Sequence, residues 1–288
     1  MPAPHVRVLG ADDAPAFESF LAPRADSSLF LLANARQAGF LDRGRRFEGT
    51  YAGAFEKDLL VAVAAHFWNG FLAVQAPEHL EAVLEKALGA SGRTISGLTG
   101  PYEQVVAARR ALRAAEWPVA VDAPEGLFGL DLKDLRVPDA VVSGAARCRR
   151  PRDEEMGFLS AWRAAYRRES LGEPEGDENV KAARDDVQEL HASGSHFVLE
   201  VQGQGDPVAY SAFNARLPEI VQVGGVWTPP DQRGRGYARA VVAGSLLDAR
   251  GQGVARAVLF TENAAVRRAY EALGFRRVGE YGLVVFRR

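Results

Sequence analysis

The chain has 288 residues, with 35 basic and 37 acidic side chains and a formal net charge of -2. Its 47% hydrophobic and 25% charged residues are typical of globular proteins and exclude a disordered or fibrous chain. The near-neutral charge gives no general attraction to nucleic acid or anionic lipid. Cys148 is the single cysteine, which excludes an intrachain disulfide and a cysteine-based zinc site.

The sequence shows neither a membrane span nor an export signal. The longest apolar stretch, Leu59 to Trp68, is too short to cross a bilayer. The first 15 residues have no basic region followed by an apolar one. We therefore expect a cytoplasmic protein that binds neither membrane nor nucleic acid.

The first half of the chain predicts helices and short strands in a mixed order. Apolar periodicity of 3.6 residues marks the helices, and β-rich runs between turn residues mark the strands. The predicted order is helix, helix, three strands, helix, strand, helix and strand. The corresponding ranges are 13–21, 28–38, 45–55, 58–67, 70–75, 77–88, 94–98, 102–115 and 126–132.

The second half predicts the same order of elements. The first helix has an acidic first turn, the last has Asn263 as its N-cap, and glycines stand at or near the helix ends, as is common at helix termini. The last strand carries a glycine at position 282, where we expect a break. The predicted ranges are 152–170, 179–192, 196–201, 208–213, 219–227, a helix ending at 251, 255–261, 263–275 and 276–288.

The repeated order favours an internal repeat of a unit of about 140 residues. Two unrelated domains that share a common order of elements are the alternative. The segment 132–151 contains two prolines and a glycine and is a plausible linker. We expect domains at 1–140 and 141–288, each of the α+β class with a mixed sheet.

A glycine-rich loop, PPDQRGRG, joins a predicted strand to a predicted helix. Gly234 and Gly236 allow the backbone to approach a ligand, and Arg233 and Arg235 add positive charge at a helix N-terminus. These features suit a diphosphate. A dinucleotide fingerprint would need a glycine where Arg239 stands, and the Gly-Lys-Ser/Thr of a nucleotide-binding P-loop is absent. A helix-opening turn without a ligand is the alternative.

The Arg233-x-x-Gly236-x-Ala238 loop, with Asn263 and the run AYEALGF downstream, resembles the GNAT superfamily of acyl-CoA-dependent N-acetyltransferases. The resemblance covers about residues 150 to 288, and its specific motifs lie in 226–275. It implies tandem GNAT-like domains, with an active C-terminal half and a degenerate N-terminal half. Between its third strand and next helix the N-terminal half has Pro77 and Glu78 in place of a glycine loop, and Glu78 would repel a phosphate.

The resemblance implies a set of coenzyme-binding residues. The backbone amides at Val226 and Thr228 would hold the pantetheine arm, and a bulge at Gly224-Gly225 would splay the strand from its parallel neighbour. The remaining positions would wrap the diphosphate or contact the coenzyme, and they are Arg233, Gly234, Arg235, Gly236, Tyr237, Ala238 and Asn263.

The resemblance also assigns Tyr270 as the general acid that protonates the departing thiolate. A core aromatic on an amphipathic helix is the alternative for Tyr270. The residue that deprotonates the acceptor amine is left open among Glu219, Glu200, His196 and water. The acidic segment 169–178 is either a lining for an amine acceptor or a solvated loop.

The expected reaction moves an acetyl group from acetyl-CoA to a primary amine by direct attack in a ternary complex. A non-catalytic acyl-CoA-binding sensor or interaction module is the alternative. We expect no metal, a small-molecule or peptide amine as the partner, and possible homodimers.

Overall fold

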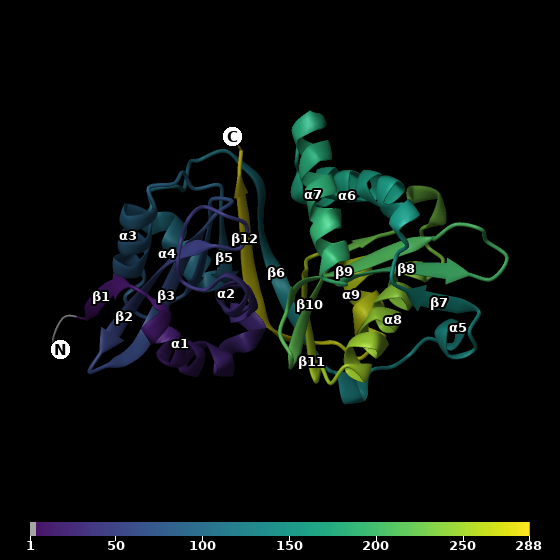
Figure 1. Ribbon diagram of the computed structural model, residues 1–288, viewed down its shortest axis with the longest axis horizontal. Coiled ribbons are helices and arrows are strands. Elements are labelled where there is room, and N and C mark those ends of the chain that lie inside the picture. The colour runs from purple at the N-terminus through teal and green to yellow at the C-terminus, as the bar shows by residue number, and fades with distance from the viewer. Residues whose placement is uncertain (1–3, 288) are drawn as a thin grey trace. The chain divides into compact units, whose positions relative to one another are not determined.

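The computed structural model describes residues 4–287, without the side chains at 123 and 265. Contacts between Cα atoms divide the chain into two compact units. One contains the chain up to Leu127 together with the last strand from Gly279, and the other runs from Phe128 to Val278. We call them unit 1 and unit 2 (Figure 1).

Unit 1 is built on six strands in the order β1-β2-β3-β4-β5-β12. Neighbouring strands are antiparallel except β4 and β5, which are parallel. In chain order, the elements of the first repeat are β1 His5–Val8, α1 Ala14–Leu21, α2 Ala25–Ala38, β2 Gly49–Glu56, β3 Leu59–Phe67, β4 Phe71–Gln75, α3 Leu80–Ser91, β5 Gly97–Pro101, α4 Tyr102–Ala111 and β6 Val119–Asp131.

Unit 2 has the same order of elements. Its strands run β6-β11-β10-β9-β8-β7, with β10 and β11 parallel. The elements of the second repeat are a short helix α5 Asp139–Val142, then β7 Ala146–Arg149, α6 Met156–Leu171, α7 Asp177–Ala192, β8 His196–Val201, β9 Ala209–Arg216, β10 Ile220–Trp227, α8 Tyr237–Gly251, β11 Arg256–Thr261, α9 Ala264–Glu271 and β12 Arg276–Phe286.

The two faces of the unit 2 sheet carry separate cores. Because successive side chains of β8 point to opposite faces, Phe197 and Leu199 lie on the face covered by α8 and α9. Val198 lies on the face covered by α6 and α7. Figure 1 shows α6 and α7 together on one side of β8–β10 and α8 on the other. Each helix therefore buries its apolar stripe against one layer of the sheet.

The predicted mixed α/β architecture and all the longer helices and strands are confirmed. Two short strands were not predicted. These are β1 and β7, each of four residues, and each opens one of the two repeated halves. The expected linker 132–151 contains β7, whose sequence Ala-Arg-Cys-Arg is too short and too basic to read as a strand.

The boundary between the units differs from the expected 140/141, because strand pairing and not chain order decides it. The final strand belongs by sequence to the second repeat, but it pairs with β5 of unit 1 from Gly97↔Val285 to Pro101↔Tyr281. The corresponding strand of the first repeat, β6, ends next to β11 in unit 2. Each repeat thus gives its closing strand to the other unit.

The expected break at Gly282 is wrong, since β12 is continuous through it. A Cβ at this position would lie 2.7 Å from the Cβ of Val105 on α4. The glycine therefore permits close packing of a helix on the strand and does not end the strand.

Candidate active site

The candidate site of unit 2 lies where β10 parts from β11. Parallel pairing joins Ile220–Gln222 to Arg256–Val258, and in the part of the chain that the structure describes it goes no further. Beyond that point, the register of β10 against β9 shifts between Gly224 and Trp227, which is a bulge. Gly225 lies in the bulge with φ +61. The predicted bulge at Gly224-Gly225 is confirmed, and it turns this end of β10 away from its parallel neighbour.

The turn after β10 has the backbone geometry that the sequence predicted. Gly234 and Gly236 have φ of +80 and +79, and Gly236 is the N-cap of α8. No atom lies within 4 Å of a Cβ built on Gly234, so the positive φ, and not crowding, calls for glycine there. The first amides of α8 have no carbonyl partner within the helix and can donate to an anion.

The arginine side chains of this turn are folded against the protein. Arg233 donates from Nε to the carbonyl of Thr228 (3.0 Å) and from Nη2 to Glu169 (2.9 Å). Its guanidinium also lies 4.9 Å from the centre of the Trp227 ring. Arg235 donates to the Asp231 carbonyl at 3.4 Å. The exposed pair Arg233–Glu169 contributes at most about 1 kcal/mol, so an anionic ligand can replace Glu169 at low cost.

Several buried polar atoms without a hydrogen-bond partner belong to β10, the turn after it and α6. Among the described residues of unit 2, five such atoms occur, and only Ser211 Oγ is on neither β10, the turn nor α6. The other four are Arg163 Nη1, Gln222 Oε1, Thr228 Oγ1 and Gln232 Oε1. Unpaired buried polar atoms are uncommon in native proteins and suggest that a ligand supplies the missing partner.

The remaining predicted coenzyme residues lie on the same elements. Val226 is in the bulge, and Tyr237 and Ala238 open α8. The Tyr237 hydroxyl accepts from Gln204 at 3.1 Å. Asn263 caps α9, because its Oδ1 accepts the amide of Val266 at 3.2 Å. The coenzyme contacts of these residues stay predictions.

Tyr270 is buried on α9 and packs against Phe275 with ring centres 5.9 Å apart. Burial raises the pKa of its phenol, and the neighbouring Tyr166 phenol on α6 raises it further. The hydroxyl therefore keeps its proton at neutral pH. Tyr270 is a member of the core, as the alternative held, but a protonated phenol can still donate a hydrogen bond.

Glu219 lies just before β10, at the end of the strand opposite the bulge. It is an exposed residue immediately before Ile220, and its carbonyl accepts the amides of Ala255 and Arg256 at 3.0 Å. Six residues of extended strand separate it from Gly225, which is about 20 Å. A general base must be within hydrogen-bond reach of its proton, so this separation argues against Glu219, whose role stays a prediction.

Glu200, the second candidate base, is held by arginines. Its Oε1 accepts from Arg149 at 2.6 Å and from Arg152 at 3.2 Å.

The third candidate, His196, is 1% exposed and has a different environment. Its Nδ1 is 3.2 Å from the Tyr210 hydroxyl and its Nε2 is 3.1 Å from Nδ1 of His191. Nε2 of His191 is in turn 2.8 Å from an exposed Asp153 carboxylate oxygen.

These four side chains form a continuous chain of hydrogen-bonding groups, which we call the Tyr210–Asp153 chain. Its inner end is at the bulge, since a Cβ on Gly225 would lie 3.8 Å from Cε1 of Tyr210. Burial, together with the charges of His191 and Arg150, lowers the pKa of His196 to about 3, so the imidazole is neutral. Burial raises the pKa of Tyr210. The sequence offered His196 as a candidate but gave no sign of its partners, which lie on other elements.

Three of the five acidic residues in the segment 169–178 form ion pairs with arginines. Glu173 pairs with Arg167, Glu175 with Arg168, and Glu169 with Arg233. These ion pairs weaken the expectation that the segment attracts a cationic acceptor.

Arg163 is a residue of this region that the sequence analysis missed. Its signal was a charged residue at position i+4 from Leu159, on the buried face of α6.

In unit 1 the described segment before the corresponding helix, 76–79, contains neither a glycine nor an arginine. His79 is the N-cap of α3, and its Nε2 is 2.6 Å from Glu56. Glu56, Glu78 and His79 bring three possible metal ligands within 4.8 Å of one another. Two carboxylates at this helix N-terminus would repel a diphosphate.

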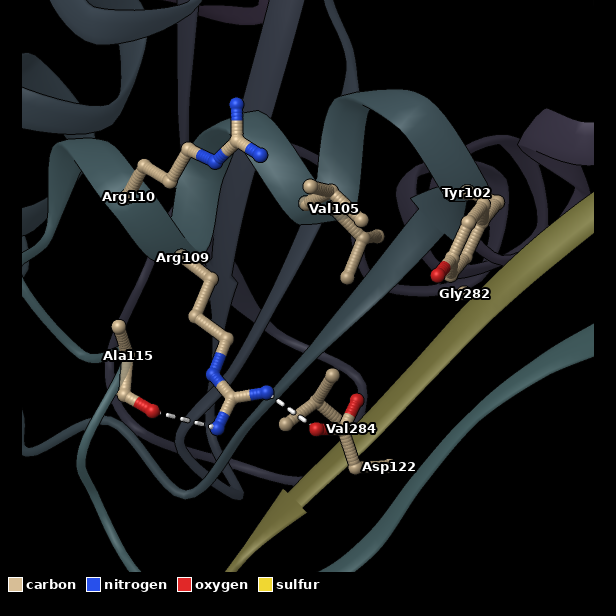
Figure 2. Close-up of a pocket in the computed structure, with 9 residues that line it drawn as sticks. Tyr102, Val105, Arg109, Arg110, Ala115, Asp122, Gly282 and Val284 are labelled. Atoms are coloured by element: carbon tan, nitrogen blue, oxygen red, sulfur yellow. Dashed lines mark hydrogen bonds and ion pairs between the residues drawn. The ribbon is translucent and has the colours of Figure 1, made fainter.

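Unit 1 contains two hollows that could be compared with the candidate site. One, of about 230 Å³, is lined by α4, the segment after it and β12 (Figure 2). Its Arg109 is bound to Asp122 and to the carbonyl of Ala115, so this cation is already paired (Figure 2). The other, of about 680 Å³, is lined by residues of the segments 8–11, 38–42 and 90–93, together with Thr50. Neither is lined by residues of the turn or the bulge.

The opening between β10 and β11 thus leads into the glycine-rich start of α8. The model of the acetyltransferase (GNAT) family matches residues 139–275. The chain therefore contains a GNAT domain in its second half, as the resemblance implied. No curated protein matches the chain.

Solved structures resemble the whole chain. A Drosophila protein has a TM-score of 0.66 at 14% identity, covering 98% of each chain. A GCN5-related N-acetyltransferase from Sphaerobacter thermophilus has a TM-score of 0.60 at 16% identity, covering 99% of this chain and 95% of that one. A tandem GNAT protein from the clavulanic acid biosynthesis pathway has a TM-score of 0.56 at 12% identity, covering 98% and 97%. At these identities the likeness shows the fold, which is that of GNAT proteins. In the part of the chain described, no helix is long and apolar enough to cross a membrane.

Proposed function

We propose that unit 2 transfers an acetyl group from acetyl-CoA to a primary amine, by direct attack of the amine on the thioester in a ternary complex. One observation carries the proposal. The bulged end of β10, parted from β11, leads directly into a turn with two positive-φ glycines at the start of α8. This arrangement offers amides to a diphosphate at the turn and room for a thioester at the bulge.

In this proposal the coenzyme diphosphate lies on the amides of Gly234–Ala238 and is also bound by Arg233 and Arg235. Arg233 exchanges its contact with Glu169 for the diphosphate, which carries more charge. The pantetheine arm follows the parted edge of β10 past Thr228 and Val226, as the family resemblance implies. The thioester then lies beside Gly225, next to the inner end of the Tyr210–Asp153 chain.

The Tyr210–Asp153 chain removes the proton of the acceptor ammonium. The ammonium proton passes to the Tyr210 oxygen as the Tyr210 proton moves to Nδ1 of His196. The proton on Nε2 of His196 moves to Nδ1 of His191, and the proton on Nε2 of His191 moves to the Asp153 carboxylate at the surface. The low pKa of His196 means that it passes a proton on and does not store one.

The neutral amine then attacks the thioester carbon, the C–S bond breaks and coenzyme A leaves as a thiolate. Tyr270 gives the sulfur a proton and regains one from the amide nitrogen being formed. Because the pKa of Tyr270 is raised, its main contribution is a hydrogen bond to the developing thiolate. No covalent enzyme intermediate forms in this scheme.

The test is thiol release from acetyl-CoA with a panel of primary amines, followed by mass analysis of the products. We expect amine-dependent release, and a loss of about 100-fold or more in kcat for Tyr210→Phe, which breaks the proton chain at its inner end. Arg152→Gln is the matched control, since Arg152 is an exposed residue outside the chain.

Two results would separate this proposal from its alternatives. Tight acetyl-CoA binding without turnover on any amine would favour a non-catalytic coenzyme-binding module. Full activity in Tyr210→Phe would remove the proton chain but leave the acetyltransferase assignment intact.

A further inference from the structure

The guanidinium of Arg163 is a buried cation that faces the bulge of β10. Its side chain is 12% exposed, and a Cβ on Gly225 would lie 2.6 Å from Nη1. Burial alone would lower the pKa of this group, but the charge of Asp186 raises it, so Arg163 stays charged. A full positive charge is therefore fixed next to the place where thioester and amine meet.

Only part of this guanidinium is paired. Nε and Nη2 both approach Oδ2 of Asp186, at 3.1 and 3.0 Å, whereas Nη1 is buried without a partner. A guanidinium presents two edges that can each bind a carboxylate. Here Asp186 binds the Nε–Nη2 edge, and the edge that contains Nη1 has no partner. Leaving a charged donor unpaired is costly unless a ligand completes it.

The number of carboxylates near Arg163 also indicates that its charge lacks a full partner. Asp186 is shared between Arg163 and Arg167, with its Oδ2 3.2 Å from Nη1 of Arg167. Arg167 has a second carboxylate, Glu173, and a further contact from Nε to Asn179. Within the described chain Arg163 pairs with Asp186 alone. Its remaining neighbours are the Tyr166 ring, 5.2 Å away, and Tyr210, neither of which is a carboxylate.

We infer that Arg163 selects acceptors that carry a carboxylate next to the amine, so that the substrate class is amino acids and similar amino carboxylates. This inference rests on the proposed acetyl transfer. The carboxylate pairs with the Nη1 edge of Arg163 and thereby directs the amine to the bulge beside Tyr210. The same cation disfavours acceptors that carry a second positive charge, such as polyamines.

The experiment compares α-amino acids with their carboxamides and decarboxylated amines, as kcat/KM per unprotonated amine. We expect the wild type to prefer the carboxylate member of each set by about 10-fold or more. Arg163→Met should lose about 10- to 100-fold on carboxylate acceptors, mainly in KM, and less than about 3-fold on the decarboxylated amines. Arg163→Lys keeps the positive charge and a hydrogen bond to Asp186. Its kcat/KM on carboxylate acceptors should therefore lie between those of the wild type and Arg163→Met. Arg168→Met, exposed on the same helix, is the control.

Equal losses on both kinds of acceptor, or a wild-type preference for the decarboxylated amines, would overturn the inference. If acetyl-CoA binds but no acceptor reacts, the proposed function fails, and the inference is then decided by calorimetry on the acetyl-CoA-loaded protein. Carboxylate-dependent binding that Arg163→Met abolishes would support it. Binding that is indifferent to the carboxylate, or no binding at all, would refute it.

Discussion

Replacing Gly234 by alanine tests whether the turn before α8 is a ligand site, and Gly253 offers a matched control. Both glycines have positive φ, +80 and +90, and a Cβ added to either would have no atom within 4 Å. They flank opposite ends of α8. Alanine therefore adds backbone strain without a steric clash at either position.

An L-residue in this region costs about 1–2 kcal/mol, so both variants should lose that much free energy of unfolding. Only Gly234→Ala should weaken acetyl-CoA binding, because relief of the strain rotates amides away from the diphosphate. A hydrogen bond to a charged group contributes about 1.5–3 kcal/mol, which predicts a rise in Kd of about 10-fold or more.

Urea unfolding and calorimetric titration with acetyl-CoA measure the two effects separately. Equal affinity in the two variants would refute the assignment of the turn as the diphosphate site. Weaker binding in both would show that general destabilisation, and not the turn, controls affinity.

Four other predictions follow from the described environments. Tyr270→Phe should lower kcat about 10- to 100-fold with little change in acetyl-CoA affinity, because it removes one hydrogen bond to the leaving thiolate. Glu219→Gln should leave kcat/KM within about 2-fold, because strand geometry separates this side chain from the bulge by ~20 Å; a large loss would contradict that placement. Cys148 should react with an aromatic disulfide about 100-fold or more slower than a free thiol at pH 8, since burial raises its pKa to about 12. His196 is unprotonated in the fold and protonates near pH 6.5 when unfolded, so its contribution to stability is complete above pH 6.5 and is lost as the pH falls towards 3. Between pH 7 and 5 the wild type should therefore lose about 2 kcal/mol that His196→Gln retains, measured by urea unfolding at each pH.

Local sequence signals predicted the elements of this fold well, because apolar period and turn residues act within a few positions of each other. They failed where the answer depends on a distant partner. The run RRVGEYGLVVF reads as a strand, but nothing within it shows that it pairs with β5 of unit 1. Gly282 alone suggests a break in the strand. Its role in packing follows only from the position of Val105 of α4 directly against it.

The same limit applies to the site. The glycine-rich turn is contiguous, so Gly234 and Gly236 and their conformation could be predicted from sequence. The proton chain and Arg163 are assembled from α6, α7, β8 and β9, and only the fold brings these elements to the bulge. A base sought on β10 alone led to Glu219, at the far end of the strand.

A comparison of the two repeats indicates what a GNAT-like unit needs in order to hold coenzyme. In unit 1, α3 begins after a residue in the left-handed region, His79 with φ +54, as α8 begins after Gly236 with φ +79. The turn that presents helix amides is thus retained in outline without glycine. What differs is charge, because Glu56 and Glu78 surround the start of α3 whereas Arg233 and Arg235 precede α8. Helix amides alone contribute only a fraction of a unit charge, and two carboxylates outweigh them. Both repeats can therefore keep the same backbone fold, while the charges of two or three side chains at the helix start decide whether a unit binds a diphosphate.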